Sequence, residues 1–315
     1  MIITGKYPKL RMRRSRKTDW MRRLVRENSL SSNDFILPIF VTEGKNKKIP
    51  IKTMPEVFRY SVDKLGQIVD RALKLKIPMV AIFPQTNSGL KDSYGSEALN
   101  ENNLVCKAIR KIKDKYKNEI GIMTDVALDP YTSHGHDGIL RDKRILNDET
   151  IEILIQQSLL QAQMGSDVIA PSDMMDGRIG EIRQELDNNS LKDIKILSYA
   201  VKYASSFYGP FRDAVGSKKS LKGDKKTYQM DFSNSEEALR EVALDIKEGA
   251  DLVMVKPGLP YLDIIKKVKE NFKIPVLAYQ VSGEYSLLMN GINKGLISEN
   301  SIYETLMSFK RAGAN

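Results

Sequence analysis

Seven short apolar segments, each followed by a stretch with helical periodicity, run along almost the whole chain. The segments are continuous rather than alternating, which is typical of parallel strands covered on both faces. We predict strands at 35–41, 79–84, 120–128, 167–172, 195–200, 251–257 and 275–280. We predict helices near 61–76, 97–115, 150–165, 176–188, 235–249, 260–271, 284–293 and 299–312. This order of elements predicts a (β/α)8 barrel, or otherwise a doubly wound sheet.

An eight-stranded barrel needs one strand more than this pattern supplies. The given sequence stops at RAGAN, residues 311–315, where an eighth strand would begin. Either the natural chain continues or the barrel closes in another way, and we favour the first. We expect about 10–20 further residues, enough for one strand and a short tail, because a chain without them would leave two strand edges unpaired.

The composition is typical of a globular protein that does not span a membrane. Its 315 residues are 41% hydrophobic, which is enough for one large barrel domain. The single cysteine, Cys106, excludes an intrachain disulfide and a multi-thiolate zinc site, and fits a reducing compartment. No apolar run approaches the ~18 residues of a membrane span, and the N-terminus lacks a secretory signal. We therefore expect a cytoplasmic protein with no membrane partner.

The net charge of +10 is concentrated in residues 1–26, which hold ten basic residues and one acid, Asp19. The rest of the chain is close to neutral. We assign residues 1–30 to an N-terminal arm and 31–315 to the barrel. Such an arm could bind nucleic-acid phosphates, carry a transit signal, or lie on a neighbouring subunit. Trp20 and Leu24 favour the subunit contact, because a purely electrostatic tail would not need apolar side chains.

Two lysines, Lys202 and Lys256, each end an apolar strand instead of lying on a helix face. Either one alone could simply extend its ammonium group to solvent. Two at the same mouth of a barrel indicate more, because an amine in an apolar site near a second cation becomes a nucleophile toward carbonyls. The pair could form Schiff bases with two carbonyl substrates.

The segment 124–138, TDVALDPYTSHGHDG, follows the third predicted strand. Its carboxylates and imidazoles are Asp125, Asp129, His134, His136 and Asp137. This spacing suggests a metal site. The alternative is a hydrogen-bonded turn in which the aspartates act as turn and cap residues.

Two more predicted strands end in polar residues. Ser172 and Asp173 follow the fourth strand, where they could contact a substrate or only cap the next helix. Ser282 follows the seventh strand and could bind an anion at a helix start.

The segment 209–230 mixes Gly, Ser and Lys without a sustained period. Loops of this length are usually functional lids or disordered insertions, and here the loop would leave the mouth of the barrel where active sites gather. Arg212, Lys225 and Gln229 in this lid could hold a carboxylate, although most of its charges are expected to be solvated.

Five motifs together resemble the porphobilinogen synthase (5-aminolevulinate dehydratase) family. They are RMRRSRKTDWMRRLVRE at 11–27, APSDMMDGR at 170–178, YGPFRDA at 208–214, MVKPGLPYLDI at 254–264 and YQVSGEY at 279–285. The resemblance covers essentially the whole chain. It implies a TIM barrel that condenses two molecules of 5-aminolevulinate to porphobilinogen, with loss of two waters, in tetrapyrrole biosynthesis.

The resemblance also implies roles for individual residues. Lys256 matches the lysine that holds the propionate-side substrate, and Lys202 matches the one that holds the acetate-side substrate. Ser282 matches a contact to the propionate-side carboxylate, whose partner tyrosine lies in the family on a strand beyond position 315. Further implied active-site residues are Arg212, Lys225 and Gln229 at the acetate-side carboxylate, and Asp125 and Ser172.

The resemblance carries expectations about metals and assembly as well. Zinc-dependent members have three cysteines where this chain has Ala127, Asp129 and Asp137. The chain therefore resembles the branch without active-site zinc, in which the two aspartates act on the substrate amines. In that branch an allosteric Mg²⁺ is held by a glutamate matching Glu241, and such oxygen ligation suits magnesium. The basic arm wraps a neighbouring subunit of an octamer, which favours an oligomer contact over nucleic-acid binding.

Two competing functions remain at this point. One is a class I aldolase on the same fold that uses a single Schiff base at Lys202 or Lys256. The other is a non-catalytic basic RNA-binding protein on a degenerate barrel. Borohydride trapping of labelled 5-aminolevulinate at both lysines would exclude both.

Overall fold

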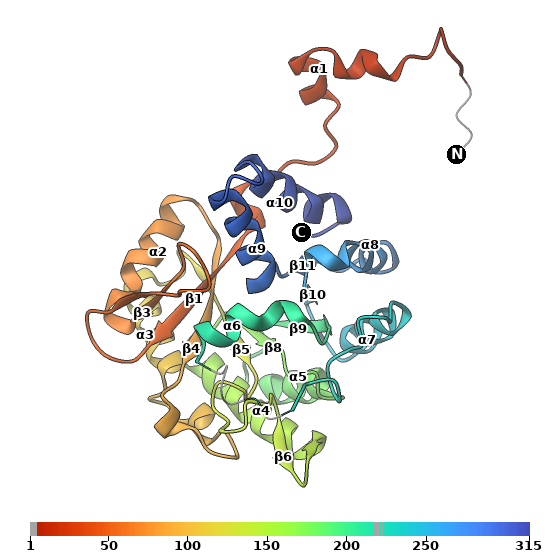
Figure 1. The fold of residues 1–315 in the computed structure, drawn as a ribbon. Helices are drawn as coiled ribbons and strands as arrows, with labels where there is room; N and C mark the ends of the chain where they lie inside the picture. Colours follow the sequence, from red (N-terminus) through yellow and green to blue (C-terminus); the bar gives the residue numbers. More distant parts are fainter. Residues whose placement is uncertain (1–4, 217–220, 222) are drawn as a thin grey trace.

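The computed structural model describes residues 5–216, 221 and 223–315, and its centre is a nine-stranded sheet (Figure 1). The strand order is β11-β10-β9-β8-β5-β4-β1-β3-β2, and all neighbours are parallel except β2 and β3. The seven predicted strands are confirmed as β1 (Ile36–Thr42), β4 (Met79–Gln85), β5 (Gly121–Val126), β8 (Val168–Pro171), β9 (Lys195–Lys202), β10 (Leu252–Lys256) and β11 (Val276–Ala278).

Helices lie around this sheet, as Figure 1 shows. The eight predicted helices are confirmed as α2 (Leu65–Lys74), α3 (Leu104–Tyr116), α4 (Asn147–Gln163), α5 (Arg178–Asn188), α7 (Glu236–Lys247), α8 (Leu262–Asn271), α9 (Ser282–Asn293) and α10 (Asn300–Ala312). In α2 the buried residues Leu65, Val69 and Ala72 recur every three or four positions, so that one apolar stripe faces the strands. The repeated β-then-α order therefore builds the α/β barrel architecture that the sequence predicts.

Several short elements were not predicted from the sequence. They are β2 (Lys48–Pro50), β3 (Phe58–Ser61), the separate hairpin of β6 (Ile139–Arg141) and β7 (Arg144–Leu146), and the short helices α1 (Asp19–Leu24) and α6 (Gly209–Ala214). All three residues of β2 are exposed, so this strand has no apolar run to reveal it. Helix α6 occupies the start of the predicted lid 209–230, whose sequence shows no sustained helical period. Residues 217–220 and 222 of that lid lie outside the described residues.

A cavity of about 630 Å³ separates β11 from the first half of β1. Most of its lining is apolar, and it includes Leu37 on β1 and Leu277 on β11. β1 pairs with β3 only through its last three residues, Phe40 to Thr42. Within the described ranges, no strand lies between these two edges, so the pairing that would close the barrel is not formed there.

The N-terminal arm extends away from the body of the molecule (Figure 1). It contains a 3-10 helix, η1 (Met12–Arg16), and a short helix, α1 (Asp19–Leu24), and neither has a buried residue. Trp20 and Leu24 are exposed in this single chain. The arm thus offers apolar side chains that nothing in its own chain covers within the described residues.

Candidate active site

The two strand-end lysines are neighbours across the sheet. Lys202 ends β9, Lys256 ends β10, and the parallel register pairs them directly. Two residues at the same register of adjacent strands point to the same side of the sheet. They are 6% and 7% exposed, so the simple alternative in which they extend into solvent is wrong.

The Lys256 amine is enclosed by aromatic rings. Its Nζ lies 4.4 Å from the ring centre of Tyr279, 5.0 Å from Tyr199, 5.4 Å from Phe211 and 5.7 Å from Tyr208. Burial lowers the pKa of Lys256 to about 7, and the positive charge of Lys202 contributes to this shift. A large fraction of the amine is therefore neutral, and so nucleophilic, near pH 7.

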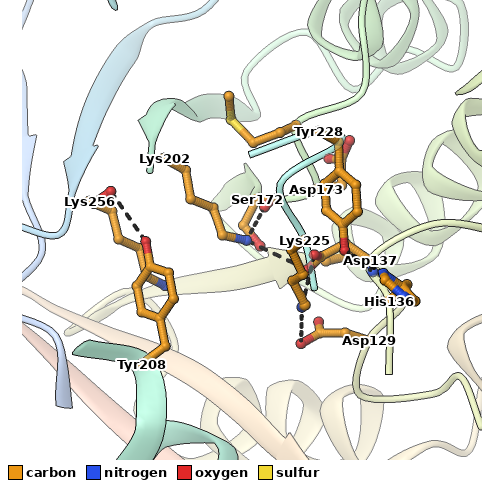
Figure 2. A network of polar contacts seen from close by, with 12 residues as sticks. Asp129, His136, Asp137, Ser172, Asp173, Lys202, Tyr208, Lys225, Tyr228 and Lys256 are labelled. Atoms are coloured by element: carbon orange, nitrogen blue, oxygen red, sulfur yellow. Dashed lines mark hydrogen bonds and ion pairs between the residues drawn. The ribbon is translucent and has the colours of Figure 1, made fainter. Parts of the chain in front are cut away.

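The Lys202 ammonium has polar partners instead (Figure 2). It donates a hydrogen bond to the backbone carbonyl of Ser172 and lies 3.5 Å from the carboxylate of Asp137. Burial opposes ionisation of Asp137, but the charges of Lys202 and Lys225 outweigh it and hold the pKa of this carboxyl well below its ordinary value. The two lysines thus stand side by side in different environments, one apolar and one ionic.

The lid contributes a third lysine to the same cluster. Lys225 Nζ lies 2.9 Å from Asp137 and 3.3 Å from Asp129, and Figure 2 shows it between the two carboxylates. The Tyr228 hydroxyl accepts a hydrogen bond from the backbone N–H of Asp137 at 3.3 Å and lies 3.0 Å from His136 Nδ1. These contacts attach residues 225–228 of the lid to the loop after β5.

Two buried carboxyl groups have raised pKa values, and one of them, Asp125, lines the same cavity as both lysines. Burial raises the pKa of Asp125 to about 6, although Lys256 and Lys202 act in the opposite direction. Burial likewise raises the pKa of Asp173 to about 6, against the effect of Arg178. Carboxyl groups with such values are suited to general acid–base catalysis.

Most of the predicted site residues line one small cavity of about 40 Å³ between the lysines and the lid. Its lining includes Asp125, Asp129, Asp137, Ser172, Lys202, Arg212, Lys225, Gln229 and Lys256. Ser282 lies just outside it, behind Phe211, whose backbone N–H donates to the Ser282 hydroxyl at 2.8 Å. Glu241 is on α7, and it does not line the cavity.

Sequence reasoning missed the aromatic residues of the site. Tyr199 lies on β9, Tyr208 in the 3-10 helix η6 (Ser206–Tyr208), Phe211 in α6 and Tyr279 after β11. The available signals were that Tyr199 precedes Lys202 by three residues and that Tyr208, Phe211 and Tyr279 lie in family motifs. Nothing in their spacing shows that they converge on Lys256.

The metal interpretation of residues 124–138 is not supported by the described part of the chain. It contains no group of three or more His, Cys, Asp or Glu side chains that could hold a metal ion. His134 Nε2 lies 3.2 Å from the carbonyl oxygen of Ser93, and His136 contacts Tyr228. The imidazoles therefore join this loop to two other segments, and within the loop His134 Nδ1 accepts a hydrogen bond from the backbone N–H of His136 at 3.2 Å. These contacts fit the hydrogen-bonded turn that the sequence left open.

Comparisons with known proteins decide the family. The family model for delta-aminolevulinic acid dehydratase matches residues 9–315. The chain belongs to the delta-aminolevulinic acid dehydratase family. A dehydratase of this name from Bradyrhizobium diazoefficiens is 56% identical, over 97% of this chain and 87% of that protein. A second dehydratase of this name, from Methanothermus sociabilis, is 50% identical over 98% of this chain and 95% of that protein.

A solved structure agrees with this family assignment. The delta-aminolevulinic acid dehydratase of Toxoplasma gondii, determined with the product porphobilinogen, superposes with a TM-score of 0.93. It is 45% identical and the match covers 97% of this chain and 87% of that one. The chain is thus an enzyme of a lyase family of porphyrin biosynthesis, which confirms the resemblance seen in the sequence. Membership of this family contradicts the aldolase and RNA-binding alternatives.

Among the described residues, no helix is both long enough and apolar enough to cross a membrane.

Proposed function

We propose that this chain condenses two molecules of 5-aminolevulinate to porphobilinogen, with release of two waters, through Schiff bases at Lys202 and Lys256. The observation that carries the proposal is the direct pairing of these two buried lysines on adjacent strands. The family match and the relative bound to porphobilinogen support the same reaction.

The pairing favours condensation through proximity. Adjacent strands lie about 4.8 Å apart, so two ketone carbons bound to these amines are held side by side. Holding both reactants in this way replaces a bimolecular encounter by an effectively intramolecular step. The two imine nitrogens accept electron density as the C–C and C–N bonds form.

The environments of the two amines assign different tasks to nearby groups. The neutral Lys256 amine attacks a ketone carbon without first losing a proton. The carbinolamine that forms then loses its hydroxyl group as water, which requires a proton from an acid. We infer that Asp125, with a pKa of about 6, donates this proton. The Asp137 carboxylate, 3.5 Å from the Lys202 Nζ, stabilises the cationic imine that forms at Lys202.

The remaining residues bind the ends of the substrates. Arg212, Lys225 and Gln229 hold the acetate-side carboxylate, and Ser282 holds the propionate-side carboxylate. Asp129 and Asp137 act on the substrate amino groups, and Ser172 positions Lys202 through its carbonyl. Small-molecule sites usually exceed ~300 Å³, and this cavity measures about 40 Å³. We therefore infer that Lys225 moves away from Asp129 and Asp137 when substrate enters.

The residues at the cysteine positions of zinc-dependent relatives do not fit a thiolate zinc site. Ala127 offers no ligand atom, and Asp129 and Asp137 already contact the Lys225 ammonium group. We therefore infer a reaction without active-site zinc.

Glu241 does fit a magnesium ion held largely by water. Burial raises the pKa of Glu241 against the effect of Arg178, and the carboxylates of Asp245 and Asp176 raise it further, so a bound cation would add to the compensation that Arg178 gives. Mg²⁺ commonly uses only one or two carboxylates and keeps its other waters. When bound there, it would supply an allosteric charge on α7, remote from the lysines.

The exposed apolar side chains of the arm, residues 1–30, suit a contact with a neighbouring subunit. We propose a homo-oligomer, an octamer, in which each arm covers the barrel 31–315 of its neighbour. We propose a cytoplasmic location and no nucleic-acid or membrane partner. Trp20 and Leu24 favour a protein contact over nucleic-acid phosphates, and no apolar run is long enough for a membrane span.

Reductive trapping tests the central proposal. The enzyme is incubated with labelled 5-aminolevulinate and borohydride, and the labelled peptides are mapped. We expect label at both Lys202 and Lys256. Label at one lysine only, together with full turnover, would contradict the mechanism.

A further inference from the structure

One buried carboxylate, that of Glu284, joins the start of α9 to the loop that follows β10. Glu284 Oε2 accepts hydrogen bonds from the backbone N–H groups of Val281 at 2.7 Å and Gly258 at 3.3 Å. Its Oε1 accepts one from the N–H of Leu259 at 2.5 Å. The residue is only 4% exposed. Three backbone donors from two separate segments therefore satisfy a single side chain.

The two segments carry two different parts of the proposed site. Gly258 and Leu259 follow directly after Lys256 and its proline, and Val281 immediately precedes Ser282. Any shift between these segments would move the Lys256 amine relative to the Ser282 hydroxyl. These are the two groups proposed to hold opposite ends of the same substrate molecule.

The junction is packed so closely that side chains would not fit in it. A Cβ on Gly258 would lie 2.4 Å from the ring of Phe309, and one on Gly283 would lie 2.4 Å from the carbonyl oxygen of Phe207. The Ser282 hydroxyl also accepts a hydrogen bond from Phe211, whose ring faces the Lys256 amine. The start of α9, the β10 loop and α6 therefore meet at one point, and Glu284 connects the first two.

Capping of α9 alone does not explain this arrangement. A helix cap requires only the bond to Val281. Elsewhere in this chain the shorter Asp34 makes the equivalent bond, from the Ser31 N–H at 2.6 Å. Two of the three bonds of Glu284 go instead to the β10 loop, at the desolvation cost of a buried carboxylate.

We propose that Glu284 is a positioning residue that fixes Lys256 relative to Ser282, an inference that rests on the proposed function. It is expected to affect Schiff-base formation at Lys256 and not at Lys202. Lys202 is held from the other side, by Ser172 and Asp137.

The variant Glu284→Asp tests this directly, because the shorter carboxylate can still cap α9 but no longer reaches the β10 loop. Trapping with labelled 5-aminolevulinate and borohydride is followed separately at each lysine by peptide mapping. We expect the trapping rate at Lys256 to fall about 10- to 100-fold, because a small misplacement of a reacting group slows a reaction by this order. The trapping rate at Lys202 should be unchanged. The Michaelis constant should rise together with the fall in kcat. A general loss of stability would slow both lysines equally.

Asn103→Ser is the matched control, since serine can still cap α3 at the Cys106 N–H but loses the bonds of Asn103 to the carbonyls of Glu97 and Ala98. It should leave the ratio of the two trapping rates at the wild-type value. If Glu284→Asp does not fold, Glu284→Gln keeps the length of the side chain and loses acceptor capacity, and the same ratio is measured. A wild-type ratio in a folded variant would overturn the inference. Failure of the wild-type enzyme to trap at both lysines would instead overturn the proposed function.

Discussion

Replacing Lys202 by methionine should raise the pKa of the Lys256 amine. Methionine keeps most of the length and apolar character of the side chain and removes the positive charge. Burial is the largest cause of the depressed pKa of about 7, and the charge of Lys202 is the second. Removing that charge also leaves Asp125 and Asp137 less compensated, which favours the protonated form of Lys256 further.

The register of β9 and β10 sets the size of the effect. Side chains paired across adjacent strands lie about 5–7 Å apart. Two unit charges about 7 Å apart at an effective dielectric constant of about 20 repel by roughly 2 kcal/mol. A change of one in pKa corresponds to 1.36 kcal/mol, so the pKa of Lys256 should rise by about 1–2.

The assay is the rate of borohydride trapping of levulinate at Lys256 as a function of pH. Levulinate offers the ketone and carboxylate without the amine. The neutral amine reacts, so the rate falls as the pH drops below the pKa. The wild-type midpoint should lie near 7, and at pH 7 the variant should react about 5- to 50-fold more slowly. At high pH the two rates should converge.

Lys195→Met is the control, because Lys195 begins the same strand and is exposed at its far end. Its pH profile should match that of the wild-type enzyme. An unchanged or lower midpoint in Lys202→Met would refute the reasoning, because it would mean that the two amines do not interact.

Three further predictions concern activity, metals and stability. Lys256→Ala should abolish turnover, and Lys202→Ala should nearly abolish it while still trapping substrate at Lys256. Substantial turnover in either variant, measured as porphobilinogen formed, would contradict a mechanism with two Schiff bases. A zinc-selective chelator should leave activity unchanged, magnesium removal should lower it in part, and Glu241→Ala should abolish only the magnesium response. Arg178→Met should lower the free energy of unfolding, measured in urea, by about 3–5 kcal/mol. The Asp245 carboxylate lies 3.1 Å from the Arg178 guanidinium and would stay buried without its cation.

The sequence by itself determined the barrel strands and the positions of the two lysines. Continuous apolar runs are visible without a structure because a strand covered on both faces needs apolar side chains at every position. Lys202 and Lys256 stood out for the same reason, since each interrupts such a run at its end. Strand β2 could not be found in this way, because its side chains are exposed and its strand pairing is with β3, which no local apolar pattern reveals.

Only the tertiary structure decided which residues act on these lysines. Tyr199, Phe211 and Tyr279 come from separate elements and meet around Lys256 because the sheet and α6 bring them there. A depressed amine pKa depends on lost hydration and on charges within a few ångströms, and neither quantity is a property of local sequence. The same holds for Glu284, which in the sequence is only the first residue of the predicted helix 284–293. Its bonds to the β10 loop exist only because two strand ends distant along the chain are neighbours in the barrel.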